Sequence, residues 1–129
     1  MKVKTVLAAG LISLATVTSA LADDVEGVWK TQVDDGAYAH IAMSPCGDKI
    51  CGVISKAFDA SGEISSPNVG KQLVWDMVAQ GGGKYAKGKI WQPSTDKVYK
   101  SKMQMSGNSL KVSGCVGPIC KKQTWSRIK

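Results

Sequence analysis

The sequence predicts an all-β protein, a small eight-stranded antiparallel up-and-down β-barrel. Short segments of strand-forming residues alternate with turn residues, at about 13 residues per strand and turn, which is close to the spacing of barrels and sandwiches. No stretch after residue 22 carries a sustained 3.6-residue apolar stripe, so no long helix is expected. Trp29 near the start and Arg127, the chain's only arginine, near the end indicate that the first and last strands meet, which removes the sheet edges.

Turn formers separate the expected strands. The strand at 97–105 has the clearest alternation, since Tyr99, Met103 and Met105 share one face while the other face is rich in lysine, as in a sheet with one wet side. The longest interruption, 59–70, is expected to be a surface loop, where β scaffolds often carry a contact surface. The expected strands cover 25–32, 37–44, 49–58, 71–80, 85–92, 97–105, 109–116 and 120–128.

The first 22 residues have the pattern of a secretory signal peptide. Lys2 and Lys4 precede an apolar run that ends in the cleavage motif Ala20-Leu21-Ala22, and the run is too short for a spanning helix. Cleavage after residue 22 of the 129 leaves one domain, 23–129, of 107 residues. We therefore expect export to the periplasm or beyond the cell, with no membrane span in the mature chain. An uncleaved N-terminal anchor is the alternative.

The charge of the mature chain is basic and is carried almost wholly by lysine. Loss of Lys2 and Lys4 lowers the net charge from +7 to +5. Arginine is the planar group suited to phosphates and bases, and an exported protein rarely meets nucleic acid, so no nucleic-acid partner is expected. A solvated basic surface with weak attraction to anionic envelope components fits this composition better.

The four cysteines are expected to form disulfides, because an exported chain meets an oxidising compartment. Four cysteines allow three connectivities. The spacing favours Cys46–Cys51 and Cys115–Cys120, since in each pair the intervening residues include turn formers that would place the partners across a short hairpin loop. The alternative is a zinc site of all four cysteines, which usually needs two intervening residues per pair. No metal and no cofactor are expected.

Five short motifs, in this order, resemble those of one bacterial family. They cover nearly the whole mature chain, and they are similar to those of the family catalogued as domain of unknown function 2147. The resemblance implies export and a lipocalin-like fold of the calycin group, and it implies no established activity. The motifs are Gly27-x-Trp29, Pro45-Cys46-Gly47-Asp48-x-Ile50-Cys51-Gly52, Gly88-Lys89-Ile90-x-x-Pro93, Leu110-Lys111-Val112 with Gly114, and Gln123-Thr124-Trp125-Ser126-Arg127.

The same resemblance assigns structural roles to residues at the two ends of the chain. It implies that Arg127 packs across the Trp29 indole and that Gly27 and Trp125 belong to the same closure of the barrel. Two features depart from the family pattern, because the segment 59–70 is short and Trp91-Gln92-Pro93 stands where the family has Tyr-Asp-Pro. A ligand or partner that members share through this loop need not be shared here.

No catalytic constellation is found in the sequence, so an enzyme is not expected. His40 is the only histidine, and a lone histidine beside Tyr38 and Ile41 is typical of a packed or surface residue rather than a base or ligand. Cysteines held in disulfides are not nucleophiles. Asp76 lies within an expected strand and points either outward or under the loop as a polar site.

Aromatic and methionine residues are the one group with binding character, and they suit a ligand pocket or a filled core equally well. The function we expect is non-enzymatic binding of a small apolar or amphipathic ligand by the exported barrel. The alternative is a cell-envelope interaction protein that contacts another protein or an anionic surface through its basic face or the 59–70 loop. The candidate ligand-binding residues are Trp29, Tyr38, Trp75, Trp91, Tyr99, Met103 and Met105.

Overall fold

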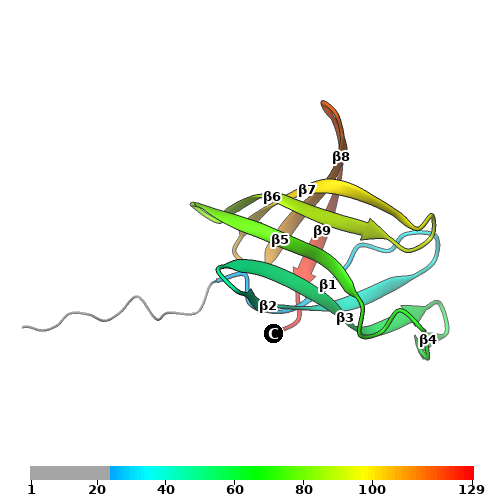
Figure 1. Cartoon of the computed structure of the whole chain (residues 1–129). Coiled ribbons are helices and arrows are strands. Elements are labelled where there is room, and N and C mark those ends of the chain that lie inside the picture. The colour runs from blue at the N-terminus through cyan, green and yellow to red at the C-terminus, as the bar shows by residue number, and fades with distance from the viewer. Residues whose placement is uncertain (1–23) are drawn as a thin grey trace, which may run out of the picture.

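The computed structural model describes residues 24–129, and the expected signal peptide at 1–22 lies outside the described residues. The described part of the chain forms nine strands, and no helix in it is long and apolar enough to cross a membrane (Figure 1). The strands are β1 (Gly27–Lys30), β2 (Tyr38–Cys46), β3 (Lys49–Asp59), β4 (Gly62–Ile64), β5 (Gln72–Gly81), β6 (Lys84–Gln92), β7 (Lys97–Ser106), β8 (Ser109–Val116) and β9 (Ile119–Arg127).

All strand pairs are antiparallel, and the sheet order is β2-β1-β9-β8-β7-β6-β5-β3-β4. Strand β2 also pairs with β3, which closes eight of the strands into a barrel and leaves β4 beside β3. Neighbours in the barrel are neighbours in sequence, apart from β4 and the closing pair of β1 and β9. The predicted eight-stranded antiparallel up-and-down barrel is therefore confirmed.

One expectation about the segment 59–70 is wrong, because residues Gly62–Ile64 form the short strand β4 rather than loop. They pair with Ala57–Asp59 at the end of β3. Asp59 holds the turn between the two strands, since its carboxylate accepts hydrogen bonds from the backbone N–H and the hydroxyl of Ser61, at 2.8 and 2.6 Å. These bonds, the hydroxyl bond first, lower the pKa of Asp59. This turn chemistry makes a local hairpin out of a polar, loop-like sequence.

Both expected disulfides are present. Cys46 is bonded to Cys51 in the β2–β3 hairpin, and Cys115 is bonded to Cys120 in the β8–β9 hairpin, with Cα atoms 5.8 and 4.0 Å apart. All four cysteines are therefore engaged, which excludes the tetra-cysteine zinc site. Two disulfides fit the oxidising environment of an exported protein.

The first and last strands meet where Trp29 of β1 pairs with Arg127 of β9. The guanidinium carbon of Arg127 lies 4.4 Å from the centroid of the Trp29 ring. Its Nη1 and Nη2 also donate to the backbone carbonyls of Glu26 and Asp24, at 3.1 and 2.7 Å. One side chain thus joins the last strand to the first strand and to the segment before it.

Gly27 of the Gly-x-Trp motif lets the last residue of the chain come close to the backbone of β1. Its φ is +126°, a conformation that other residues rarely adopt, and a side chain there would meet the carbonyl of Lys129. That carbonyl accepts a hydrogen bond from the N–H of Val28 at 2.5 Å. In this motif the glycine allows the close approach of Lys129, and the indole two residues later is buried.

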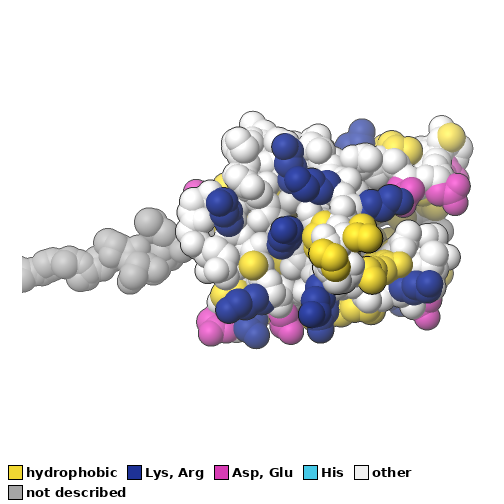
Figure 2. All heavy atoms as spheres, turned by 90° about the horizontal axis from the view of Figure 1, so that it is seen from above, with side chains coloured by type: hydrophobic (Ala, Val, Ile, Leu, Met, Phe, Trp, Pro, Cys, Tyr) yellow, Lys and Arg dark blue, Asp and Glu magenta, His cyan; other side chains and the backbone are white. Residues whose placement is uncertain are grey.

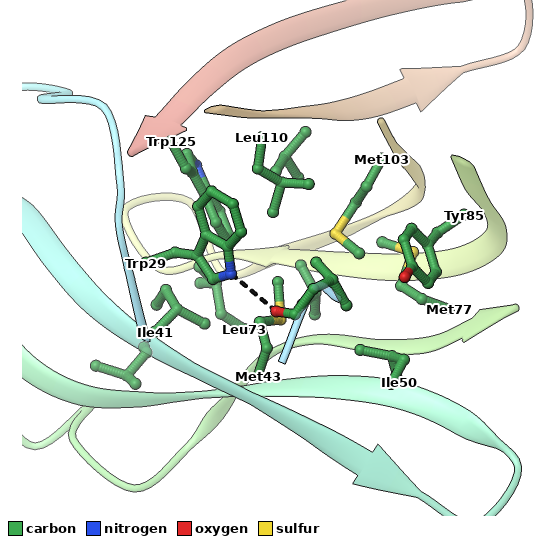
Figure 3. Packing of buried hydrophobic residues seen from close by; sticks show 14 residues of the cluster. Trp29, Ile41, Met43, Ile50, Leu73, Met77, Tyr85, Met103, Leu110 and Trp125 are labelled. Atoms are coloured by element: carbon green, nitrogen blue, oxygen red, sulfur yellow. Dashed lines mark hydrogen bonds between the residues drawn. The ribbon is translucent and has the colours of Figure 1, made fainter. Parts of the chain in front are cut away.

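The hydrophobic core fills one end of the barrel, which we call the packed end. The β2–β3, β5–β6 and β7–β8 turns surround this end. Trp29 and Trp125 are fully buried in the core (Figure 3). The Trp29 Nε1 donates to the carbonyl of Val25 at 2.9 Å, so the indole is satisfied without solvent. The core cluster is Val25, Trp29, Ile41, Met43, Ile50, Ile54, Leu73, Val74, Met77, Tyr85, Met103, Leu110, Val112 and Trp125.

Candidate functional site: a cavity at the open end of the barrel

The opposite end of the barrel, which we call the open end, holds a cavity of about 690 Å³. The segments around it are the β1–β2 connection, the chain between β3 and β5, the β6–β7 turn and the β8–β9 hairpin. This volume is within the range of about 300–1,000 Å³ that is usual for small-molecule sites. The barrel is therefore neither fully filled nor fully hollow, because a packed half and an open half lie end to end.

Small residues at the cavity wall explain why this end is hollow. Ala39 of β2 and Ala57 of β3 pair directly and both line the cavity. Gly114 of β8 also lines it, and a β-carbon there would come within 3.3 Å of Ile90 and 3.6 Å of Tyr99. Larger side chains at these positions would occupy the space, so the cavity is encoded by residues that leave no side chain to fill it.

The wall of the barrel is incomplete beside β9. Strand β1 pairs with β9 only at Trp29–Arg127 and Lys30–Ser126, whereas β8 accompanies β9 from Ile119 to Ser126. Beyond Lys30 the β1–β2 connection is joined to β9 by a side chain, since the N–H of Thr124 donates to Oε1 of Gln32 at 2.9 Å. Gln32 and residues 121–123 line the cavity, which therefore also reaches this edge of β9.

An aromatic cluster stands at the rim where β2 begins and β3 ends. The rings of Tyr38 and Phe58 stack with centroids 4.7 Å apart, and the His40 ring lies 4.6 Å from Phe58. The Nζ of Lys30 lies 4.6 Å from the centroid of Tyr38. Burial, followed by the charges of Lys56 and Lys30, lowers the pKa of His40. His40 is therefore a packed residue of the rim, and its lowered pKa favours the neutral form.

Trp91 forms a second aromatic group of the rim, on β6. Its Nε1 donates to the carboxylate of Asp96 at 2.8 Å, and the Nζ of Lys71 lies 5.5 Å from its ring. These contacts fix the indole at the mouth of the cavity, where it contributes apolar surface. Apolar residues deeper in the wall include Ile54, Leu73 and Val112, which belong to the core cluster as well.

Several polar side chains at the cavity are not engaged by the fold, among them those of Tyr99 and Lys121. Lys121 pairs with Gly114 across β8 and β9, so it shares a face with Gln123 and the buried Trp125, and Tyr99 lies beside Gly114. Within residues 24–129, neither the Tyr99 hydroxyl nor the Lys121 ammonium group makes a hydrogen bond or ion pair. An acidic or hydroxyl group of a bound molecule can therefore pair with them without displacing a partner.

The seven candidate residues from the sequence divide into two sets. Trp29 and Met103 are buried in the packed core, Met105 packs against that core, and Trp75 is half-buried and does not line the cavity. Asp76, next to Trp75, is exposed and points outward, with a φ of +59° at an irregular step in the pairing of β3 with β5. The candidates that do line the cavity are Tyr38, Trp91 and Tyr99.

Several cavity residues were outside the sequence-based set, chiefly Ala39, Ala57, Gly114 and Lys121. The period-two alternation of β9 places Lys121 and Trp125 on the same face, so the pattern contained a signal for the lysine. Alanine and glycine carry no such signal. They leave space for the cavity only when the residues around them do not fill it.

The closed barrel, the Trp–Arg closure and the cavity at one end define a small lipocalin-like β-barrel. The chain belongs to the family of uncharacterised proteins conserved in bacteria, DUF2147, whose model matches residues 27–127. Among solved structures it is similar to protein HP1028 from the human pathogen Helicobacter pylori, described as belonging to the lipocalin family. The TM-score is 0.65 at 17% identity, over 82% of this chain and 84% of that chain, so this likeness concerns the fold. No curated protein matches the chain.

Proposed function

We propose that this protein is an exported, non-enzymatic binding protein that holds a small apolar or amphipathic ligand in the open half of its barrel. The observation that carries the proposal is the cavity of about 690 Å³ beside a fully packed core. The packed half gives the barrel its stability, so the open half need not be filled for the protein to fold. A cavity kept open by alanine and glycine is available to a ligand.

The walls of the cavity favour an apolar body in the ligand. Ile54, Leu73, Ile90 and Val112 line it, with Phe58 at the rim. Each buried methylene group is worth about 0.8 kcal/mol, and association costs at least about 4 kcal/mol. A ligand of ten to twelve buried carbons would therefore retain about 4–6 kcal/mol, a dissociation constant between about 1 mM and tens of micromolar, so a screen must extend to high micromolar concentrations.

The free polar groups favour a ligand with an acidic or hydroxyl end. Lys121 and Tyr99 are placed to receive such a group while the apolar part lies deeper in the barrel. Lys121 is exposed, so an ion pair there contributes only about 0–1 kcal/mol and mainly sets the orientation of the ligand. We further propose the periplasm as the working compartment, which the two disulfides support.

Filling the cavity with a side chain tests the proposal. In Ala39→Trp the new indole would occupy the lumen, whereas in Ala42→Trp on the same strand it would lie outside, because Ala42 alternates with the buried Ile41 and Met43. The oxidised mature protein would be screened by thermal shift and tryptophan fluorescence against fatty acids, isoprenoids and aromatic metabolites.

We expect the wild type and Ala42→Trp to bind a member of this set with similar affinity and Ala39→Trp to bind it at least tenfold more weakly. Circular dichroism would establish that both variants are folded. Absence of any shift with the wild type, or equal binding by both variants, would contradict a ligand site in the open half.

A further inference from the structure

The tip of the β8–β9 hairpin is an exposed apolar point at the mouth of the cavity. Val116 and Ile119 pair across the tip and, at 66% and 76%, are the most exposed large hydrophobic side chains within residues 24–129. The last pair between β7 and β8 is Lys100–Cys115, so no neighbouring strand covers residues 116–119. Figure 1 shows this hairpin standing clear of the barrel at the top of the view.

The hairpin tip is also held in place. The disulfide between Cys115 and Cys120 joins its two strands directly below the exposed residues. Both residues share the inward face of the hairpin with Gly114 and Lys121 and line the mouth of the cavity, and the disulfide fixes them there in a short closed hairpin. Their exposure is therefore built into the fold.

Lysines surround this apolar tip. Lys100 lies opposite Cys115, and Lys121 and Lys122 follow Cys120 in β9. From residue 84 to the end of the chain Asp96 is the only acidic residue, and its carboxylate accepts the hydrogen bond from the Trp91 Nε1. Figure 2, which looks down on the top of Figure 1, shows a compact hydrophobic cluster with lysine or arginine side chains around it and acidic side chains near the edges of the view.

Exposed apolar residues are concentrated at this end of the protein. Of the six large hydrophobic side chains that are exposed within residues 24–129, Ile128 alone belongs to the packed end. The others lie in the segments that surround the cavity mouth or at the start of β7, and they are Val33, Val69, Val98, Val116 and Ile119. These exposed apolar residues and the part of the cavity beside β9 thus lie at the same end of the barrel.

From these observations we propose that the β8–β9 hairpin docks the protein onto an anionic lipid bilayer, with Val116 and Ile119 in the headgroup region and the neighbouring lysines on the lipid phosphates. Apolar tips with cationic residues beside them match the layered chemistry of a bilayer surface, where anionic headgroups cover hydrocarbon. The cavity edge beside β9 would then face the membrane, which allows a lipid-like molecule to pass between bilayer and lumen.

A second copy of the chain is a poorer occupant of this surface. Two hairpin tips packed against each other would bring Lys100, Lys121 and Lys122 of both copies together without acidic partners, and like charges at close range oppose association. A surface dense in negative charge relieves this repulsion, which is why the lysines favour an anionic bilayer over self-association.

Vesicle co-sedimentation tests the docking directly, with the oxidised mature protein and no added ligand. Vesicles of phosphatidylcholine with phosphatidylglycerol are compared with vesicles of phosphatidylcholine alone. We expect the wild type to bind the anionic vesicles, to bind the neutral ones poorly, and to dissociate as salt is raised. In Ile119→Trp, contact with anionic vesicles should shift the added indole emission to the blue.

Two variants separate insertion from simple charge attraction. Val116→Ser with Ile119→Ser should weaken binding at least tenfold, while Ile128→Ser, an exposed aliphatic residue at the packed end, should bind as the wild type does. Lys100→Gln with Lys122→Gln should weaken binding about 25-fold, since each lysine near an anionic surface is worth about fivefold.

The docking is overturned if the wild type does not bind anionic vesicles or if the serine variant binds them as well as the wild type does. It is equally overturned if light scattering shows a dimer that the serine variant dissolves while vesicle binding is absent. Ala39→Trp should still dock, so failure of the ligand site and failure of the membrane surface give different results.

Discussion

Removing the Arg127 side chain should destabilise the barrel by about 2.5–4 kcal/mol. The guanidinium lies 4.4 Å from the Trp29 ring, a contact worth about 0.5–2 kcal/mol. It also donates to the carbonyls of Asp24 and Glu26, and each hydrogen bond from a charged group contributes about 1.5–3 kcal/mol. We take less than this range, about 1 kcal/mol each, because Arg127 is partly exposed and water can replace it at these carbonyls.

The effect should be large because the first and last strands share a short contact. Two residue pairs connect β1 to β9, at Trp29–Arg127 and Lys30–Ser126, and beyond them Val28 forms backbone hydrogen bonds with residues 128 and 129. A domain of this size is stable by about 5–15 kcal/mol, so the loss is a substantial fraction of the total. The melting temperature should fall by about 10 °C or more.

Urea unfolding followed by circular dichroism measures this prediction. Arg127→Ala should lower the urea midpoint without changing the slope of the transition. Arg127→Lys should recover only part of the loss, because lysine keeps the charge but cannot serve two carbonyls and the indole face together. Lys84→Ala, at an exposed lysine of the packed end, should stay within about 0.5 kcal/mol of the wild type.

A double-mutant cycle with Trp29→Leu isolates the contact between the two side chains. The expected coupling is about 0.5–2 kcal/mol. If Arg127→Ala and the wild type unfold at the same urea midpoint, or if the coupling is zero, the closure of the barrel does not depend on this pair.

Three further predictions concern the rim, a hairpin and the core. The single histidine, His40, should titrate below its usual value near 6.5, so its contribution to stability is present above that pH and is lost as pH falls through its lowered pKa; an NMR midpoint at or above 6.5 would contradict this. Replacing Cys115 and Cys120 together by serine should cost at most about 2 kcal/mol because the closed loop is short, and a larger loss in urea unfolding would refute the estimate. Gly52→Ala should cost about 1–3 kcal/mol by overpacking, since the added carbon would lie 2.7 Å from side-chain atoms of β2, and an unchanged melting temperature would show that the core yields.

Much of the fold could be predicted from local patterns in the sequence. The alternation at 97–105 assigned Tyr99 and Met103 to the same face of a strand, and the structure places them so. The spacing of Cys115 and Cys120 predicted a disulfide across a hairpin, because two residues on either side of a Gly-Pro turn come close together in space. The packing of the Arg127 guanidinium across the Trp29 indole was implied by the family resemblance rather than by any local rule.

The position of the cavity is a property of the tertiary structure. Alternation says which side of a strand a residue faces, but it does not say how deep along the barrel the residue lies. Tyr99 and Met103 share a face, yet the first lines the cavity and the second is buried in the packed core. Depth depends on the tilt and relative shift of all eight strands, which no single segment records.

The sequence by itself determined the eight strands of the barrel, the directions in which their side chains face and the two disulfides, because these follow from contacts between residues close in the chain. The tertiary structure decided where the barrel is empty, through Ala39, Ala57 and Gly114, since an absent side chain has meaning only among its spatial neighbours. It also decided that the hairpin tip stands free, because the β7–β8 register ends at Lys100–Cys115 and leaves the residues beyond without a neighbouring strand.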